Sequence, residues 1–311
     1  MIAGSNHIRA LGGQVQGVDL ILCSAFVVTE LNGGDEMKFV RYGDSGTEKP
    51  GVLDQAGNLR DLSGVFEDLS GAALGRLGNV APETLPLVAG DVRFGPPVSN
   101  VGKLVCIGLN YYGHAAEMGM DIPTEPVMFL KATSAINGPN DPIIMPRGSQ
   151  KTDWEAELGI VIGRTAKYVD EADALSHVAG YLVVNEVSER ALQLEHGGQW
   201  TKGKSCDTFA PLGPWLVTPD EVGDVQNLAL TLSVNGDVMQ AGNTSDMIFP
   251  VAKVISYLSQ IMTLHAGDII STGTPAGVGV GMKPQRFLRA GDVVELSIEK
   301  LGGQRQVVRA D

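Results

Sequence analysis

Short apolar runs bounded by glycine and proline dominate this sequence and constrain its fold more than any other feature. Five of them have strand length: GIVIG, GYLVVNEV, LALTLSVNG, DIISTGTP and DVVELSIE. Asn-Gly at 235–236 marks a hairpin turn. Helical spacing appears mainly in PVAKVISYLSQIMTL, with Pro250 where a first helical turn tolerates it. Because strands outnumber helices and do not alternate with them, we expect an α+β, β-rich fold with a mixed or antiparallel sheet.

The pattern divides residues 37–311 into two domains. Residues 37–97 show short strands and turns, including VLDQAGNLRDL with a turn at Ala-Gly-Asn, and indicate a small N-terminal β domain. Gly-Pro-Pro at 95–97 forms a stiff break. The apolar strand at 103–107 then opens a larger domain, predicted over residues 98–311.

Residues 1–36 precede the strand-like MKFVRYG and are interpreted as an N-terminal extension without an assigned function. The apolar run at 18–28 is shorter than the ~20 residues needed to span a bilayer. Only Arg9 precedes this run, and no clear small-x-small cleavage site follows it, which disfavours a signal peptide.

Charge and cysteine usage restrict the partners and the compartment. A formal charge of −13 repels nucleic acid and anionic lipid, so small molecules are the expected ligands. The three cysteines, Cys23, Cys106 and Cys206, lie far apart and form no CxxC, which indicates a reducing compartment. We therefore expect a cytoplasmic protein that binds neither nucleic acid nor membrane.

Two glutamates share one face of the strand predicted in TDWEAELGIVIG. Side chains alternate along a strand, so Glu155 and Glu157 point the same way, and their like charges repel unless solvent or a cation lies between them. For this pair alone, a solvated strand face is the favoured alternative. Glu186, directly after the apolar strand GYLVVN, is a plausible third carboxylate ligand for a hard cation.

His114 and Glu117 lie three residues apart, which places them on one face of a helical turn. A carboxylate beside an imidazole orients it and raises its basicity, as a water-activating base requires. An incidental pair on a surface helix is the alternative. The other histidines lack such a neighbour and are expected at the surface or in turns: His7, His177, His196 and His265.

Two polar or glycine-rich segments are candidate walls of a binding site. SERALQLEHGGQWTKGKSCDTFAPLGPW is too long for a simple connection and offers Arg190, Gln193 and Lys204 to an anion. Pairing of Lys204 with Asp207 at the surface is the alternative. STGTPAGVGVG lacks the Lys-Ser/Thr of a P-loop and is interpreted as a pocket wall in which Thr274 donates a hydroxyl.

The order of WEAEL, NEVSER, KGKSCDTF, NG…QAGNTSDM and GDIISTGTPAGVG resembles the fumarylacetoacetate hydrolase family from about Lys103 to the C-terminus. This resemblance implies a mixed β-roll catalytic domain, a homodimer or higher homo-oligomer, and Mg²⁺ or Mn²⁺ as cofactor. It also implies site residues: Glu155, Glu157 and Glu186 as metal ligands; His114 with Glu117 as the dyad that activates water; Lys204 as the active-site lysine; and Arg190, Gln193, Thr274 and Lys131 as substrate-binding residues.

Two positions depart from the family pattern. Glu186 stands where the family normally carries aspartate, so the charge is kept but the side chain is one methylene longer. This change is expected to shift or weaken the site, or to favour a roomier ion such as manganese or calcium. Ala191 stands where many members carry aspartate, which removes a group able to orient the site.

Within the family, LEHGGQWTKGKSCDTFAPLGPWLVT is similar to the branch that hydrolyses 2,4-diketo-3-deoxy-L-rhamnonate or L-fuconate. That branch implies C3–C4 cleavage, in which hydroxide attacks C4 and pyruvate enolate leaves, giving pyruvate and a hydroxy acid such as lactate. Alternatives on the same scaffold are acylpyruvate hydrolysis, oxaloacetate decarboxylation, and hydratase or isomerase chemistry. A different alternative is a non-catalytic keto-acid binder whose metal site is spoiled by Glu186.

Overall fold

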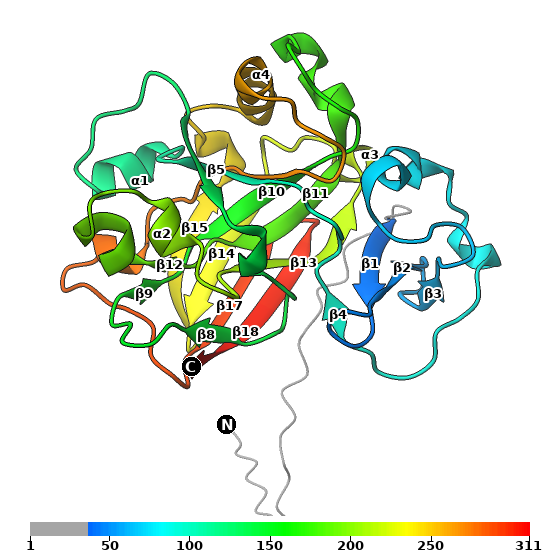
Figure 1. Ribbon diagram of the computed structural model, residues 1–311, viewed down its shortest axis with the longest axis horizontal. Helices are drawn as coiled ribbons and strands as arrows, with labels where there is room; N and C mark the ends of the chain where they lie inside the picture. Colours follow the sequence, from blue (N-terminus) through cyan, green and yellow to red (C-terminus); the bar gives the residue numbers. More distant parts are fainter. Residues whose placement is uncertain (1–36) are drawn as a thin grey trace, which may run out of the picture. The chain divides into compact units, whose positions relative to one another are not determined.

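A computed structural model of the chain describes residues 37–311 (Figure 1). The extension predicted over residues 1–36, with Cys23 and His7, lies outside the described residues. The β-rich fold expected from the sequence is confirmed. The strands are β1 (Lys38–Tyr42), β2 (Lys49–Leu53), β3 (Leu59–Asp61), β4 (Phe94–Gly95), β5 (Leu104–Gly108), β6 (Val127–Lys131), β7 (Ile136–Asn137), β8 (Ile143–Met145), β9 (Thr152–Asp153), β10 (Ala156–Ile162), β11 (Val178–Asn185), β12 (Ser188–Glu189), β13 (Ala210–Val217), β14 (Ala229–Val234), β15 (Asp237–Asn243), β16 (Ile269–Ser271), β17 (Val293–Ile298) and β18 (Gly302–Ala310).

Helices are few and short within the described part of the chain. The α-helices are α1 (Tyr112–Glu117), α2 (Thr201–Lys204), α3 (Pro219–Val222) and α4 (Val251–Ile261), and a single π-helical turn spans Ala191–Glu195. The predicted helix is therefore confirmed as α4, with Pro250 as the residue that precedes its first turn. No helix in residues 37–311 is long and apolar enough to cross a bilayer.

The strands form two large sheets that pack on one another. An 11-stranded sheet runs in the order β3-β2-β1-β13-β11-β10-β16-β5-β6, with β4 beside β1 and β7 beside β13. A five-stranded sheet has the order β15-β14-β17-β18-β8, and β9 pairs with β12 separately. Most pairs are antiparallel, but β16–β5, β13–β7 and β18–β8 are parallel, so both large sheets are mixed.

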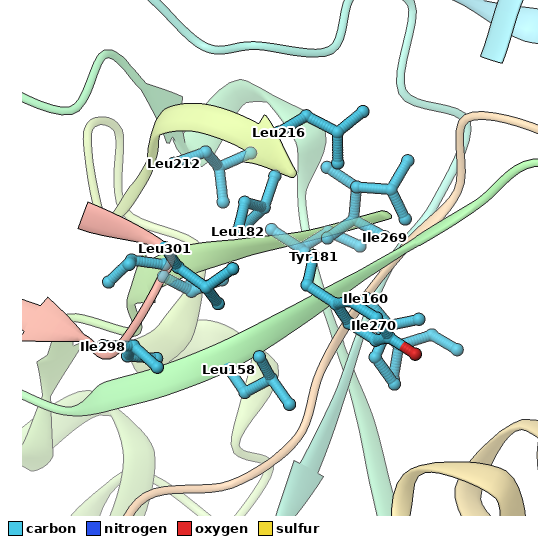
Figure 2. Close-up of a cluster of buried hydrophobic side chains, with 14 of the residues drawn as sticks. Leu158, Ile160, Tyr181, Leu182, Leu212, Leu216, Ile269, Ile270, Ile298 and Leu301 are labelled. Carbon is cyan, nitrogen blue, oxygen red and sulfur yellow. The ribbon is translucent and has the colours of Figure 1, made fainter. Parts of the chain in front are cut away.

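The core lies between the two sheets, where β10, β11 and β13 contact β14, β17 and β18. Figure 2 shows some of the buried side chains, with Leu158 and Ile160 on one face of β10 and Leu182 of β11 on the opposite face of the same sheet. Strands β10 and β11 are buried on both faces, which explains why their sequences are nearly continuous apolar runs.

The N-terminal strands extend the large sheet. The predicted hairpin turn in residues 52–62 is confirmed, because it joins β2 to β3, and β1 pairs with both β2 and β13. Strands from residues 37–97 and from the later part of the chain therefore share one sheet. The domain division at residue 97 stays a prediction.

Strand directions bring the candidate residues to one end of the large sheet. Strand β10 runs antiparallel to β11 and to β16, so its start lies beside the ends of both. Strand β16 is parallel to β5, so these two also end together. The chain segments that leave β5, β11 and β16 therefore meet the segment that enters β10.

Candidate active site

Three buried carboxylates converge at this end of the sheet. Glu155 and Glu157 lie at the start of β10, and Glu186 directly follows β11. Because Ala156 pairs with Asn185, Glu186 lies beside the start of β10. One oxygen from each lies within 4.8 Å of the others. Their exposed fractions are 4%, 1% and 1%, so the alternative of a solvated strand face is wrong.

The carboxylates carry unequal proton affinities. Burial and the nearby charges of Glu186 and Glu155 raise the pKa of the Glu157 carboxyl well above its usual range. Burial also opposes ionisation of Glu155, but the cationic Lys204 and Arg190 outweigh it and hold the pKa of that carboxyl below its ordinary value. Like charges are thus held close together in a buried site, an arrangement that a cation between them relieves.

Glu157 is oriented by the segment that follows β16. Its Oε2 accepts hydrogen bonds from the Ser271 hydroxyl at 2.6 Å and from the Gly273 amide at 2.8 Å. Sequence reasoning missed these two partners, although the segment STGTP contains both. A carboxylate fixed by two donors keeps its other oxygen available for a ligand.

Two lysines lie against the carboxylates. Lys204 Nζ, from α2, is 2.6 Å from Glu155 Oε2 and 3.3 Å from Glu186 Oε1, so surface pairing with Asp207 is wrong. Lys131 Nζ, at the end of β6, donates to the Val187 carbonyl at 2.9 Å and lies 3.4 Å from Glu186 Oε1. Both ammonium groups therefore compensate the charge of Glu186.

The Arg190 guanidinium binds side chains of the protein, including two carboxylates. Its Nε donates to Asp153 Oδ2 at 2.8 Å, its Nη1 donates to Gln193 Oε1 at 2.9 Å, and its Nη2 forms an ion pair with Glu155 at 2.7 Å. Asp153, which sequence reasoning missed, also accepts hydrogen bonds from the backbone amides of 279 and 280. The guanidinium predicted to bind substrate is thus engaged in holding the site together.

The predicted His114–Glu117 pair forms on α1. His114 Nδ1 lies 3.2 Å from Glu117 Oε2, and Glu117 Oε1 accepts the Gly277 amide at 2.9 Å. At the start of the helix, the buried Asn110 amide donates to the carbonyls of Phe249 and Thr272. Both ends of α1 are therefore tied to neighbouring segments.

A pocket of about 480 Å³, open to solvent, joins these groups. Eight of the ten predicted site residues line it, and Glu117 and Lys131 lie behind the lining. The Thr274 hydroxyl donates to the Ala156 carbonyl at 2.9 Å and accepts from Gln240 at 2.7 Å, so its proton is directed to the protein. The segment predicted as a long loop folds instead into a π-helical turn, α2 and the start of β13.

The donor set fits a hard divalent cation. Three carboxylate oxygens are typical ligands of Mg²⁺, Mn²⁺ or Ca²⁺. At the base of the pocket, the four acids Asp153, Glu155, Glu157 and Glu186 face three bases, Lys131, Arg190 and Lys204. When all four acids are ionised they outnumber the bases by one, and a bound cation would favour that state by offsetting the repulsion that raises the pKa of Glu157.

Comparisons with known proteins agree with this geometry. Residues 103–309 match the family model described as fumarylacetoacetate (FAA) hydrolase C-terminal. A 2,4-didehydro-3-deoxy-L-rhamnonate hydrolase from Sphingomonas sp. (strain SKA58) is 58% identical over 273 residues, which cover 88% of this chain and 96% of that protein. The resemblance inferred from the sequence motifs is confirmed.

Solved structures extend the likeness to the whole described fold. A fumarylacetoacetate hydrolase from psychrophilic Exiguobacterium antarcticum has a TM-score of 0.77 and 38% identity, covering 88% of this chain and 100% of that one. A probable 2-hydroxyhepta-2,4-diene-1,7-dioate isomerase from Mycobacterium abscessus has a TM-score of 0.76 and 33% identity, covering 89% and 99%. Proteins named for different reactions thus share this fold.

Proposed function

This chain belongs to the fumarylacetoacetate hydrolase family and is an enzyme, and on that premise we propose that it is a metal-dependent hydrolase of 2,4-diketo acids. It cleaves the C3–C4 bond of 2,4-diketo-3-deoxy-L-rhamnonate or L-fuconate and releases pyruvate and a hydroxy acid such as lactate. The observation that carries the proposal is one pocket in which three buried carboxylates lie beside a His–Glu pair and a buried lysine. The 58% identical relative, named for this substrate class, supports it.

Glu155, Glu157 and Glu186 are the proposed ligands of Mg²⁺ or Mn²⁺, with Ca²⁺ a further possibility for the longer Glu186. When bound, such an ion supplies Lewis acidity that favours negative charge on the substrate's keto oxygen. The Ser271 hydroxyl and the Gly273 amide hold Glu157 in the required orientation. Arg190 acts on Glu155 through their ion pair, in addition to the substrate-binding role predicted for it.

His114 is the proposed base that takes a proton from water. Because Nδ1 faces Glu117, Nε2 is the ring nitrogen left to accept this proton, and the Glu117 carboxylate stabilises the imidazolium that results. The hydroxide attacks the C4 carbonyl, the C3–C4 bond breaks, and its electron pair passes to C3. Return of the proton to C3 gives pyruvate, so protons and electrons balance.

Lys204 is proposed to stabilise the enolate that leaves. An ammonium group has three N–H donors; one is hydrogen-bonded to Glu155, and Glu186 Oε1 lies 3.3 Å from Nζ in an ion pair. At least one donor is left for an anionic oxygen in the pocket. The Phe129 ring centroid, 5.2 Å from Nζ, further fixes the position of the charge.

Other chemistry on this scaffold remains the second candidate, because one of the similar structures is named an isomerase. Acylpyruvate hydrolysis needs the same groups, whereas oxaloacetate decarboxylation needs no attacking water. A non-catalytic keto-acid binder is disfavoured, since the base, the lysine and the carboxylates all meet in one pocket. We further propose that the enzyme acts in the cytoplasm, in sugar acid degradation, as a homodimer or higher homo-oligomer.

The proposal is tested by identifying products from a substrate panel in the presence of magnesium or manganese. The panel contains 2,4-diketo-3-deoxy-L-rhamnonate, acetylpyruvate and oxaloacetate; the L-fuconate derivative is the same compound as the first, because only the C5 stereocentre remains and the two sugars share it. Equal amounts of pyruvate and lactate from the deoxy-sugar acid, formed faster than pyruvate from the other two, support both the reaction and the substrate. Pyruvate from acetylpyruvate or oxaloacetate alone would keep the family chemistry and reject the sugar-acid substrate.

A further inference from the structure

The residues that line the pocket are segregated by chemistry and by depth. Every charged or polar side chain in the lining is buried: His114, Glu155, Glu157, Glu186, Arg190, Gln193, Lys204 and Thr274. Every lining residue that reaches solvent is apolar or glycine: Gly108, Met118, Met120, Leu194 and Trp200. We call the four side chains of Met118, Met120, Leu194 and Trp200 the rim.

The rim is formed by two segments that meet at the pocket mouth. Met118 and Met120 follow α1, whereas Leu194 lies on the π-helical turn and Trp200 directly precedes α2. Met120 is 48% exposed and Leu194 is 42% exposed, compared with 1% for Glu157 at the base. Trp200 is fixed in place, since its ring packs edge-on against Phe129 with centroids 5.4 Å apart.

Given the function proposed above, the change from a polar base to an apolar mouth determines the direction in which a substrate binds. The carboxylate and keto oxygens belong at the buried base, where the cations and the candidate metal ligands lie. The C3–C4 bond then lies near His114, and the substituent on C4 points toward the mouth. The lining side chains that reach solvent offer it carbon atoms, the two methionine sulfurs and a single N–H donor, that of the Trp200 indole.

We propose that the rim is a specificity subsite for an alkyl end, so that the enzyme prefers 2,4-diketo acids whose distal carbon is a methyl group. A terminal hydroxymethyl that displaces water from these side chains can regain a strong hydrogen bond only from the Trp200 indole N–H, and an apolar pocket discriminates by roughly 10- to 100-fold on this basis. A terminal carboxylate is disfavoured more strongly. Within residues 37–311, the pocket lining contains one lysine and one arginine, Lys204 and Arg190. Both are buried and already paired with Glu155, so neither is placed to bind a carboxylate at the mouth.

The test compares kcat/KM for three 2,4-diketo acids that differ only in the terminal group attached to C5. This group is methyl, hydroxymethyl or carboxylate. Each value is divided by the same protein's kcat/KM on acetylpyruvate, which lacks the distal atoms. The variants are Leu194→Ser and Met120→Ser, since both positions are substantially exposed and tolerate a polar side chain. Ile122→Ser is the matched control, because Ile122 is 56% exposed and lies outside the lining.

We expect the parent enzyme and Ile122→Ser to prefer methyl over hydroxymethyl by at least about 10-fold, and the two rim variants to reduce that preference several-fold. An unchanged preference in the rim variants, with acetylpyruvate still cleaved, would overturn the rim proposal and leave the proposed function standing. A parent enzyme that prefers the distal carboxylate would also overturn it. Cleavage of none of these substrates would reject the proposed function and the rim subsite together.

Discussion

At the scale of single residues, a substitution of His114 distinguishes hydrolysis from decarboxylation, because only hydrolysis needs a base that activates water. The change His114→Ala removes the group that accepts a proton from water, so pyruvate release from a 2,4-diketo acid should fall by about 100- to 10,000-fold. Oxaloacetate decarboxylation needs no water base and should fall less. Both rates are measured by coupled detection of pyruvate.

The control for this experiment is His196→Ala, because His196 is an exposed histidine outside the pocket lining. It should hydrolyse the diketo acid at the parent rate. A His114→Ala protein that also hydrolyses at the parent rate would show that another group activates water.

Gly281 tests how the dyad is held. A Cβ added there would lie 2.8 Å from Glu117 Oε1 and closer still to its Cγ and Cδ, so Gly281→Ala must displace the carboxylate from His114 and from the Gly277 amide. We expect kcat to fall by at least about 10-fold, which corresponds to the loss of about 1.4 kcal/mol of transition-state stabilisation. Steady-state kinetics give kcat, and the thermal midpoint checks the fold.

Gly64→Ala is the matched change, since a Cβ at Gly64 meets nothing within 4 Å. It should leave kcat unchanged. Equal kcat in Gly281→Ala and the parent would mean that the position of Glu117 is not critical.

Residue spacing predicted part of this site and could not predict the rest. Strand and helix periods fix which neighbours share a face, so Glu155 with Glu157 and His114 with Glu117 were accessible from the sequence. The Arg190–Asp153 pair joins residues 37 positions apart, and no local pattern records it. The substrate-binding role of Arg190 stays a prediction, and its hydrogen bonds to Asp153 and Gln193 could not be predicted.

A chain of buried amides links the site to the C-terminal strand at the scale of elements. The backbone amide of Glu155 donates to Asn185 Oδ1, and the Asn185 amide donates to Gln306 Oε1 at 3.0 Å. Gln306 donates to Gln304 Oε1 at 2.9 Å, and Gln304 donates to backbone carbonyls including that of Val183. Strand β18 therefore supports the backbone beside two candidate metal ligands.

The change Gln306→Leu interrupts this chain without adding volume. It leaves the Asn185 amide and the Pro139 carbonyl without their partner in the core, at a cost of about 1–3 kcal/mol for each buried group. The free energy of unfolding, measured in urea, should fall accordingly. Gln150→Leu at an exposed position is the control, and a Gln306→Leu protein as stable as this control would contradict the account.

The elements themselves were partly predictable. Apolar runs predicted β5, β10, β11, β14, β16 and β17. Strands β10 and β11 are buried on both faces and read as continuous apolar segments, whereas β14 and β17 bury only alternate residues. Strand β13 was missed, although it lies centrally between β1 and β11, since Pro211 and Pro214 break the usual strand pattern. Strand β18 was also missed, because glycine and polar residues at its start do not show the usual apolar pattern of a strand.

The site is a product of topology at the scale of the whole molecule. Its groups come from β5, β10, β11 and β16 and from the wall at 189–204, which meet only when the large sheet is complete. Sequence order alone could not show this convergence; the resemblance to a family supplied it. The proximity of three buried carboxylates is the feature on which the proposed chemistry depends.

The most direct test is pyruvate release from 2,4-diketo-3-deoxy-L-rhamnonate by chelator-stripped protein, before and after magnesium or manganese is restored. We predict that removing the metal reduces the rate of pyruvate release at least about 100-fold and that either ion restores this rate. The variant Glu186→Gln keeps the side-chain length and loses the charge, so the same ion concentration should restore its rate poorly. A stripped protein that releases pyruvate at the full rate, or a Glu186→Gln protein that responds to metal like the parent, would contradict the proposed metal site.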